Sequence, residues 1–210
     1  MIKKLLISFL LLGLNLDANI VDEGILAYNK GNSQRAFQIW NKACSDGEYD
    51  ACYYIGVMYD TGNGVRQNKQ KATQIYSNAC DNGSMAACFN LGIGYEKGDG
   101  VIKNSHKAAK LFRKACDGGY MHGCFDLGVM YNNGEGVLKN HPKAIKLYRK
   151  ACNGGYMEGC NNLGVMYMKG SGVRQDLGKA KELFGVICDN GIQQGCDRYR
   201  VLNEMMSGAK

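Results

Sequence analysis

Ten cysteines and three histidines are the residues of this chain that most readily supply nucleophiles and metal ligands. The cysteines form two series with a constant interval of 36 residues, and the second series follows the first by eight residues. The first series is Cys44, Cys80, Cys116, Cys152 and Cys188, and the second is Cys52, Cys88, Cys124, Cys160 and Cys196. Every cysteine therefore belongs to a pair, and each pair could form a metal site, a reactive thiol with its partner, or a disulfide.

The spacing of the cysteines favours disulfides over the two other chemistries. Zinc sites usually bring ligands together at spacings of about two to four residues, often with histidine. His106, His122 and His141 instead occupy three different phases of the 36-residue interval. A catalytic cysteine is usually a single residue beside a base, and not a residue copied five times. We therefore predict disulfides, with no metal and no cofactor, and keep the metal site and the nucleophile as less favoured alternatives.

The N-terminal segment has the features of a secretory signal peptide. Lys3 and Lys4 precede an apolar run over residues 5–14, and a polar turn leads to Ala18. The run is shorter than the roughly 18 residues that a membrane-spanning helix needs, so we predict no stable membrane anchor. We expect residues 1–18 to be a cleaved signal peptide and the protein to be secreted or periplasmic. Disulfides persist in those compartments, in agreement with the even pairing of the cysteines.

The same 36-residue interval runs through the rest of the sequence and predicts an all-α repeat protein. Apolar residues of one unit, such as Ala108, Phe112 and Ala115, recur three or four residues apart, which is typical of a helix with one buried face. Glycine-rich turns separate two such helical patterns in every unit. We predict a single repeat domain over residues 19–210. Its predicted parts are an atypical first helical pair (19–45), four repeats (46–81, 82–117, 118–153 and 154–189) and a capping helix (190–210).

Four glycines stand in the middle of predicted helices, at Gly56, Gly92, Gly128 and Gly164. Glycine in a helix interior costs about 1 kcal/mol relative to alanine, so a compensating contact is expected at these positions. We predict that the four glycines allow neighbouring helices to approach closely. Arg200 stands where a fifth glycine would fall, which is expected of a terminal cap.

The unit pattern LGxxY…GxGV…KAxxxY/FxxAC resembles the Sel-one-like repeat, a relative of the tetratricopeptide repeat. The two cysteines on either side of the turn are similar to those of the Helicobacter cysteine-rich protein family. The resemblance covers residues 36 to about 199 and implies a right-handed α/α solenoid of helical hairpins. In that arrangement one cysteine ends a helix and its partner begins the next, at a Cα separation within the roughly 4.4–6.8 Å that a disulfide needs. The implied bridges are Cys44–Cys52, Cys80–Cys88, Cys116–Cys124, Cys152–Cys160 and Cys188–Cys196.

Solenoids of this kind usually bind extended peptides or partner surfaces in a concave groove. On the tetratricopeptide-like frame, two adjacent positions that precede each helix glycine face this groove. They are Tyr53, Tyr54, Phe89, Asn90, Phe125, Asp126, Asn161 and Asn162. Asn90 and Asn162 match an asparagine that often grips peptide backbone in tetratricopeptide-like repeats, and we expect them to bind ligand. For the aromatic residues, packing between neighbouring helices is the alternative to ligand binding.

The formal net charge is +7, and removal of Lys3, Lys4 and Asp17 with the signal peptide leaves 24 basic and 18 acidic residues. Part of the excess lies in a basic ridge on the outer helices, which consists of Arg113, Lys114, Arg149 and Lys150. We interpret this ridge as a solvated face, with attraction to acidic cell-wall polymers or membrane surfaces as the alternative. No nucleic-acid-binding motif is recognised, so nucleic acid is not a predicted partner.

We predict an exported, monomeric repeat protein that binds a partner protein, a peptide or a peptidoglycan fragment. The family resemblance implies an alternative, because Helicobacter cysteine-rich proteins are commonly described as penicillin-binding proteins and slow β-lactamases. The ligand would then be a β-lactam. The residues do not support this alternative independently, since the sequence holds no S-D-N or K-T-G motif and its three histidines are scattered. We therefore assign no catalytic residue.

Overall fold

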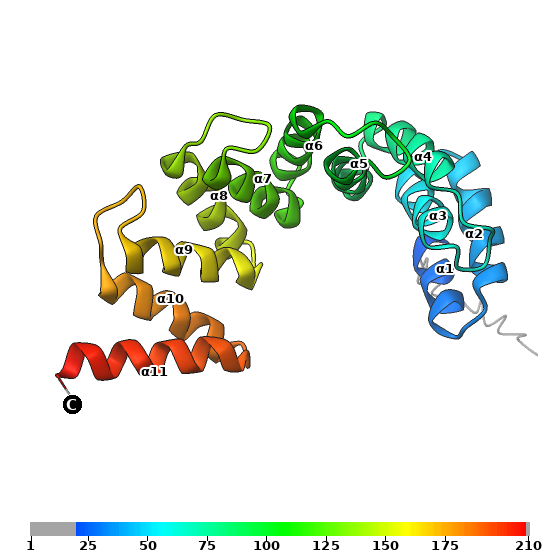
Figure 1. Ribbon diagram of the computed structural model, residues 1–210. Coiled ribbons are helices and arrows are strands. Elements are labelled where there is room, and N and C mark those ends of the chain that lie inside the picture. Colours follow the sequence, from blue (N-terminus) through cyan, green and yellow to red (C-terminus); the bar gives the residue numbers. More distant parts are fainter. Residues whose placement is uncertain (1–19, 209–210) are drawn as a thin grey trace, which may run out of the picture.

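Eleven helices follow one another in residues 20–208, the part of the chain that the computed structural model describes. They pack side by side into an arch (Figure 1). The helices are α1 (Ile20–Asn29), α2 (Ser33–Ser45), α3 (Tyr49–Thr61), α4 (Lys69–Asp81), α5 (Met85–Lys97), α6 (Ser105–Asp117), α7 (Met121–Asn133), α8 (His141–Asn153), α9 (Met157–Lys169), α10 (Leu177–Asp189) and α11 (Gln193–Ser207). The predicted all-α solenoid is confirmed. The predicted signal peptide lies outside the described residues.

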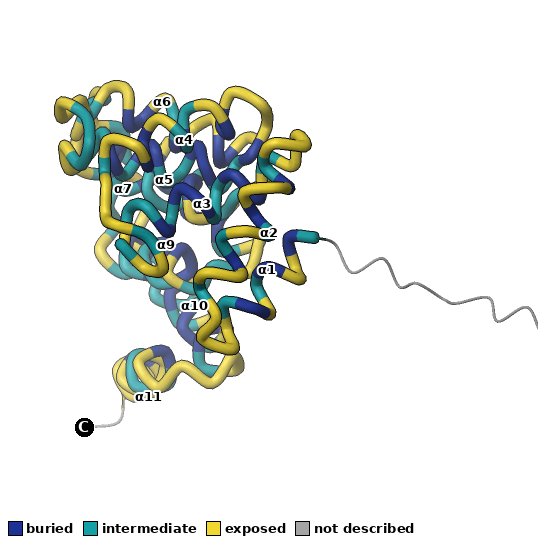
Figure 2. The backbone as a smooth tube through the Cα atoms, turned by 90° about the vertical axis from the view of Figure 1, so that its right-hand side faces the viewer, coloured by how far each residue is buried: buried dark blue, intermediate teal, exposed yellow. Residues whose placement is uncertain are grey.

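Each odd-numbered helix up to α9 forms a hairpin with the even-numbered helix that follows it, and each hairpin packs against the next. Buried residues line the contacts between helices, whereas the turns are largely exposed (Figure 2). Almost all contacts therefore join helices that are adjacent in the chain, as expected of a solenoid without a single central core.

The even-numbered helices begin at capping residues that were not identified from the sequence. Asn68, Asn104 and Asn140 each precede the first helical residue, and their side-chain oxygen accepts a hydrogen bond from the backbone N–H three residues on. Asn32 and Asp176 cap α2 and α10 in the same way. Asn and Asp are preferred at this position because the side chain satisfies an N–H group that has no partner within the helix.

Asn104→Ala is expected to lower the free energy of unfolding by about 1 kcal/mol, because the backbone N–H of Lys107 loses its acceptor. Urea unfolding followed by circular dichroism measures this change. Asn78→Ala is the matched control, since Asn78 is an exposed asparagine inside α4. A capping role for Asn104 is contradicted if the two variants are equally stable.

A glycine meets a large buried ring inside each of the five hairpins. A Cβ atom on Gly92 would lie 2.6 Å from the ring of Phe112, so no larger residue fits without a shift of the helices. The equivalent pairs are Gly56 with Tyr76, Gly128 with Tyr148 and Gly164 with Phe184. The predicted close approach of helices at the four glycines is confirmed. Gly24, which was not identified from the sequence, makes the same close contact with the ring of Trp40. Arg200, at the equivalent position of α11, is exposed.

A disulfide joins each hairpin to the helix that follows it. The five bridges are Cys44–Cys52, Cys80–Cys88, Cys116–Cys124, Cys152–Cys160 and Cys188–Cys196, with Cα–Cα distances of 4.5–4.8 Å. In every bridge the first cysteine lies in the last turn of an even-numbered helix and the second in the first turn of the next odd-numbered helix. The predicted disulfide in each turn is thus confirmed, and residues 20–208 contain no free cysteine.

The four residues of the basic ridge are exposed, in agreement with a solvated face, and each also donates a hydrogen bond to a neighbouring helix. The ammonium group of Lys114 donates to the carbonyl oxygen of Cys80 at 2.8 Å, and that of Lys150 donates to the carbonyl oxygen of Cys116 at 2.8 Å. The arginine contacts are Arg113 with the Tyr131 hydroxyl and Arg149 with the Tyr167 hydroxyl. Each lysine reaches the C-terminal end of the preceding even-numbered helix, where the carbonyl groups have no N–H partner inside the helix and the helix dipole attracts cations. The ridge therefore links successive hairpins.

Candidate binding groove

The eight predicted groove residues lie in the second turn of α3, α5, α7 and α9. In Figure 1, α5 and α7 lie on the inner side of the arch relative to α6 and α8. All eight side chains are half-buried, so each has one part packed against the protein and another part open to solvent. Because the positions recur every 36 residues, successive odd-numbered helices present them in equivalent places.

The aromatic groove residues pack against buried rings of the even-numbered helices. Tyr54 stacks on Trp40 with ring centroids 4.7 Å apart, and Phe89 lies 5.5 Å from Phe112. The other contacts are Tyr53 with Tyr76 at 6.2 Å and Phe125 with Tyr148 at 5.8 Å. Packing between helices, the alternative considered for these residues, therefore accounts for one side of each ring.

Three further side chains join Phe89 and Phe125 into an aromatic row. Tyr120 and Tyr156 immediately precede α7 and α9, and His122 lies in the first turn of α7. The His122 ring is 5.0 Å from Tyr120 and 4.4 Å from Tyr156. Phe89 lies 5.2 Å from Tyr120, and Phe125 lies 5.2 Å from Tyr156. These three residues were not assigned to the groove from the sequence, although their variation between otherwise similar turns was a signal.

Tyrosine hydroxyl groups hold the two groove amides. The Nδ2 group of Asn90 donates to the Tyr76 hydroxyl oxygen at 3.2 Å, and the Asn162 side chain is hydrogen-bonded to Tyr148. Each tyrosine lies on the preceding even-numbered helix, 14 residues before its asparagine. The hydrogen bonds give each amide a defined orientation, which suits a group that is to exchange hydrogen bonds with an extended peptide backbone.

Asp126 occupies the position of these amides on α7 but lacks the tyrosine partner, because Phe112 stands 14 residues before it. Its carboxyl group has no hydrogen-bond or ion-pair partner in the described part of the chain. Burial raises the pKa of Asp126 to about 6, and nearby Glu96 adds to the rise while Lys97 opposes it. Asp126 is thus the groove side chain that gains most from a polar partner outside the protein.

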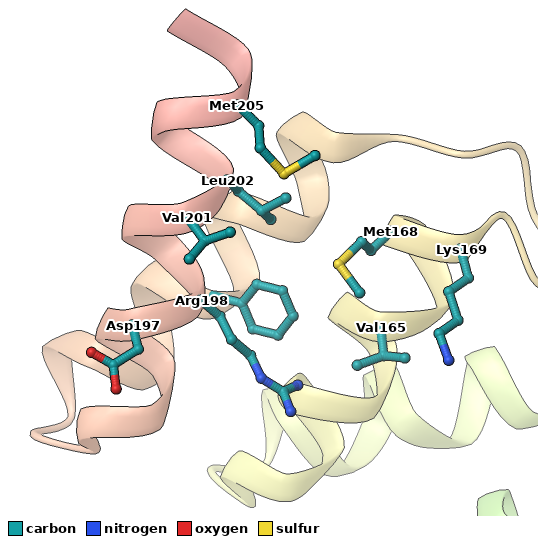
Figure 3. A pocket seen from close by; sticks show the side chains of 9 residues that line it. Val165, Met168, Lys169, Asp197, Arg198, Val201, Leu202 and Met205 are labelled. Carbon is teal, nitrogen blue, oxygen red and sulfur yellow. The ribbon is translucent and has the colours of Figure 1, made fainter. Parts of the chain in front are cut away.

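The C-terminal end of the groove contains a largely apolar cavity of about 460 Å³ between α9 and α11 (Figure 3). Its apolar lining includes Val165, Met168, Val201, Leu202 and Met205. Arg198 crosses this end of the groove, donates to Oδ1 of Asn161 at 2.6 Å and lies 5.3 Å from the ring centroid of Phe184. Arg198 was missed from the sequence, although it stands 36 residues after Asn162 and the repeat interval was the signal.

The side chains that bear on β-lactam hydrolysis can be located among the described residues. No group of three or more His, Cys, Asp and Glu side chains placed to hold a metal ion occurs among residues 20–208. A Ser-x-x-Lys spacing, which serine β-lactamases use, occurs once, at Ser207 and Lys210. The Ser207 hydroxyl donates to the carbonyl oxygen of Glu204 at 3.0 Å, and Lys210 lies outside the described residues. None of the described helices combines the length and apolar character of a membrane span.

Comparison with protein families gives a match along most of the chain. The model of the Sel1 repeat matches residues 23–48, 50–84, 86–120, 122–156 and 158–191. Among relatives of known sequence, the chain is 36% identical over 50 residues to "Putative beta-lactamase HcpE" of Helicobacter pylori. That match covers 24% of this chain and only 14% of the relative.

Solved structures of similar architecture include proteins described by the same repeat or its fold. A Sel1 repeat protein from Oxalobacter formigenes is 30% identical with a TM-score of 0.77, and the match covers 85% of this chain and 71% of that chain. A protective antigen of uropathogenic Escherichia coli strains, which displays an SLR fold, is 30% identical with a TM-score of 0.80 over 89% of this chain and 41% of that one. Cysteine rich protein B of Helicobacter pylori is 34% identical with a TM-score of 0.51, and the match covers 68% of this chain and 96% of that chain.

Proposed function

The chain belongs to the Sel1 repeat family, and on this premise we propose that it is an exported binding protein that holds a partner protein or peptide along its groove. One observation carries the proposal: half-buried aromatic and polar side chains recur at equivalent places on successive odd-numbered helices. Aromatic side chains with one packed edge give a large contact area at a low cost in side-chain entropy. Oriented amides add hydrogen bonds to peptide groups, and the concave surface of a solenoid is long enough for an extended segment.

The five disulfides support a location outside the cytosol, because reducing conditions inside the cytosol work against such bridges. We extend the proposal to secretion or a periplasmic location, with residues 1–18 as a cleaved signal peptide and a monomeric mature chain. A peptidoglycan fragment is the alternative ligand for the same groove.

No observation on the described residues favours β-lactam hydrolysis. The idea rests on the family resemblance and on the name of one relative, which matches this chain over 50 residues. Residues 20–208 hold no free cysteine and no group of side chains placed to bind a metal ion, and the Ser207 hydroxyl of the S-x-x-K sequence donates to a backbone carbonyl group. Turnover of a chromogenic cephalosporin that stays with the protein through purification to homogeneity would support β-lactam hydrolysis as a function.

Asn90→Ala combined with Asn162→Ala is expected to weaken capture of the partner from periplasm and culture medium by roughly tenfold or more, because two backbone-binding groups are lost. Pull-down with the immobilised protein, followed by quantitative mass spectrometry, measures the capture.

Asn41→Ala combined with Asn78→Ala is the matched control, since both asparagines are exposed on the outer helices α2 and α4. Circular dichroism of each variant verifies that the helices are intact. The proposed groove is wrong if the groove variant and the control variant capture the same proteins in equal amounts.

A further inference from the structure

A second cavity, of about 380 Å³, opens at the N-terminal end of the molecule. It is lined by α1, by the first two turns of α3, by the start of α5 and by the turn before α7. Its chemically active side chains are those of two aspartates and three tyrosines: Asp22, Asp50, Tyr53, Tyr54 and Tyr120. The lining contains no lysine, arginine or histidine.

The two carboxylates of this cavity have no cationic partner in the described part of the protein. Asp22 and Asp50 are exposed, and neither takes part in a salt bridge between residues 20 and 208. Oδ1 of Asp50 accepts a hydrogen bond from the Ser84 hydroxyl at 2.7 Å, which orients the carboxylate. The cavity therefore carries negative charge that the protein itself does not balance.

The rings beside these carboxylates are held in place and stay uncharged. Tyr54 stacks on Trp40 at 4.7 Å, and Tyr53 meets Tyr54 edge-on at 5.0 Å. Burial raises the pKa of Tyr54, and the nearby charges of Asp50 and Asp22 raise it further. Burial also raises the pKa of Tyr53, to about 12. The hydroxyl groups thus remain neutral, and the parts of the three rings that line the cavity can attract a cation.

Elsewhere in the described repeats, tyrosine rings are contacted by a lysine, which the cavity tyrosines are not. Four equivalent tyrosines of the odd-numbered helices each have a lysine of the next even-numbered helix over the ring, at 4.1–5.5 Å from the centroid. The pairs are Tyr59 with Lys71, Tyr95 with Lys107, Tyr131 with Lys143 and Tyr167 with Lys179. No such cation lies over Tyr53, Tyr54 or Tyr120 among residues 20–208.

We propose that this cavity binds a cationic side chain, the ammonium group of a lysine or the guanidinium group of an arginine, of the segment held in the groove. The ring faces attract the cation through their quadrupoles, and the two carboxylates supply opposite charge and hydrogen-bond acceptors. The inference rests on the proposed function, because it assigns one residue type to the partner. The cavity at the opposite end of the groove is lined by two cations, Arg198 and Lys169, and one carboxylate, Asp197, so the two ends differ in net charge.

The site can be tested with small probes on the intact protein labelled with ¹³C in its tyrosine rings. The probes are N-acetyl-lysine methylamide, N-acetyl-arginine methylamide and the uncharged N-acetyl-norleucine methylamide, whose chain is similar in length to that of lysine. We expect the two cationic probes to shift the ring signals of Tyr53, Tyr54 and Tyr120 in a saturable way, and the norleucine probe to leave them unchanged. Equal shifts with the norleucine probe would overturn the proposal.

Two variants identify the source of the attraction. Asp22→Asn with Asp50→Asn removes both charges, while the amide oxygen introduced at position 50 can still accept the hydrogen bond from Ser84. We expect this double variant to bind the lysine probe about fivefold or more weakly. Glu182→Gln, at an exposed position of α10, is the control and should leave binding unchanged. Unchanged binding in the double variant would also overturn the proposal.

The outcomes separate this inference from the proposed function. If a partner is captured in a manner that depends on Asn90 and Asn162 but the lysine probe shifts no cavity tyrosine, only the cation site is wrong. If the probe binds as expected but no partner depends on Asn90 and Asn162, the cation site stands and the groove assignment is wrong.

Discussion

Cys116→Ala combined with Cys124→Ala is expected to lower the free energy of unfolding by about 2.5 kcal/mol, the loop-entropy contribution of a bridge that closes about nine residues. Both cysteines are almost fully buried, so lost packing of the two sulfur atoms adds to this figure. Reduction of all five bridges removes on the order of 12 kcal/mol by the same reckoning. Since ordinary domains are stable by about 5–15 kcal/mol, we expect the fully reduced protein to unfold.

Urea unfolding of the oxidised protein, the double alanine variant and the reduced protein measures these differences. Cys188→Ala with Cys196→Ala is the matched control, because its bridge spans the same number of residues but its cysteines are only partly buried. Loop-closure entropy alone predicts that both variants lose the same free energy of unfolding. Burial of the sulfur atoms predicts a larger loss for the variant at Cys116 and Cys124. An unfolding midpoint that does not change on reduction would show that the bridges do not stabilise the fold.

Asp126→Asn is expected to raise the free energy of unfolding by about 2–3 kcal/mol at pH 8 and to change it little at pH 4. Burial raises the pKa of this carboxyl group from 3.8 to about 6. Between these values the folded protein keeps a proton that the unfolded chain has released, so the stability of the native protein falls as the pH rises through this window. Well above pH 6 the folded protein bears the full free-energy cost of a buried, ionised Asp126. The uncharged amide of the Asp126→Asn variant does not bear this cost.

Stability curves of both proteins between pH 4 and pH 8 test this expectation, together with a ¹³C titration of the Asp126 carboxyl group. Asp189→Asn, at an exposed position near the end of α10, is the control and should follow the native curve. Parallel curves for the native protein and Asp126→Asn would contradict the predicted cost of ionisation in the groove.

The fold could be predicted from the sequence because the same chemistry recurs every 36 residues without a gap. Buried positions, mid-helix glycines and cysteine pairs each depend on contacts between helices that are adjacent in the chain, so a periodic pattern determines them locally. Gly24 was missed because the first turn is shorter, and its spacing to Trp40 therefore differs from that of Gly92 to Phe112.

The candidate groove could be predicted only in part. Its helix positions follow from the period, but the partner of each side chain depends on a second position in another helix. Asn90 is hydrogen-bonded to Tyr76, which lies 14 residues earlier. The residue 14 before Asp126 is Phe112, which offers no hydroxyl group. Neither partner can be read from the groove positions alone. The hydrogen bond from Lys114 to the carbonyl oxygen of Cys80 was missed for the same reason, since it spans 34 residues and depends on how successive hairpins are rotated.

The short span of each disulfide also bears on how the chain reaches its native state. The two cysteines of a bridge are eight residues apart, whereas cysteines at equivalent positions of neighbouring units are 36 apart. Closing a short loop costs less entropy and takes less time than closing a long one, so the native partners meet before foreign ones. A chain that leaves a secretion channel N-terminus first would expose both members of one pair before the next pair emerges. In such an exported chain, oxidation would proceed one inter-hairpin turn at a time, before the remaining helices have packed.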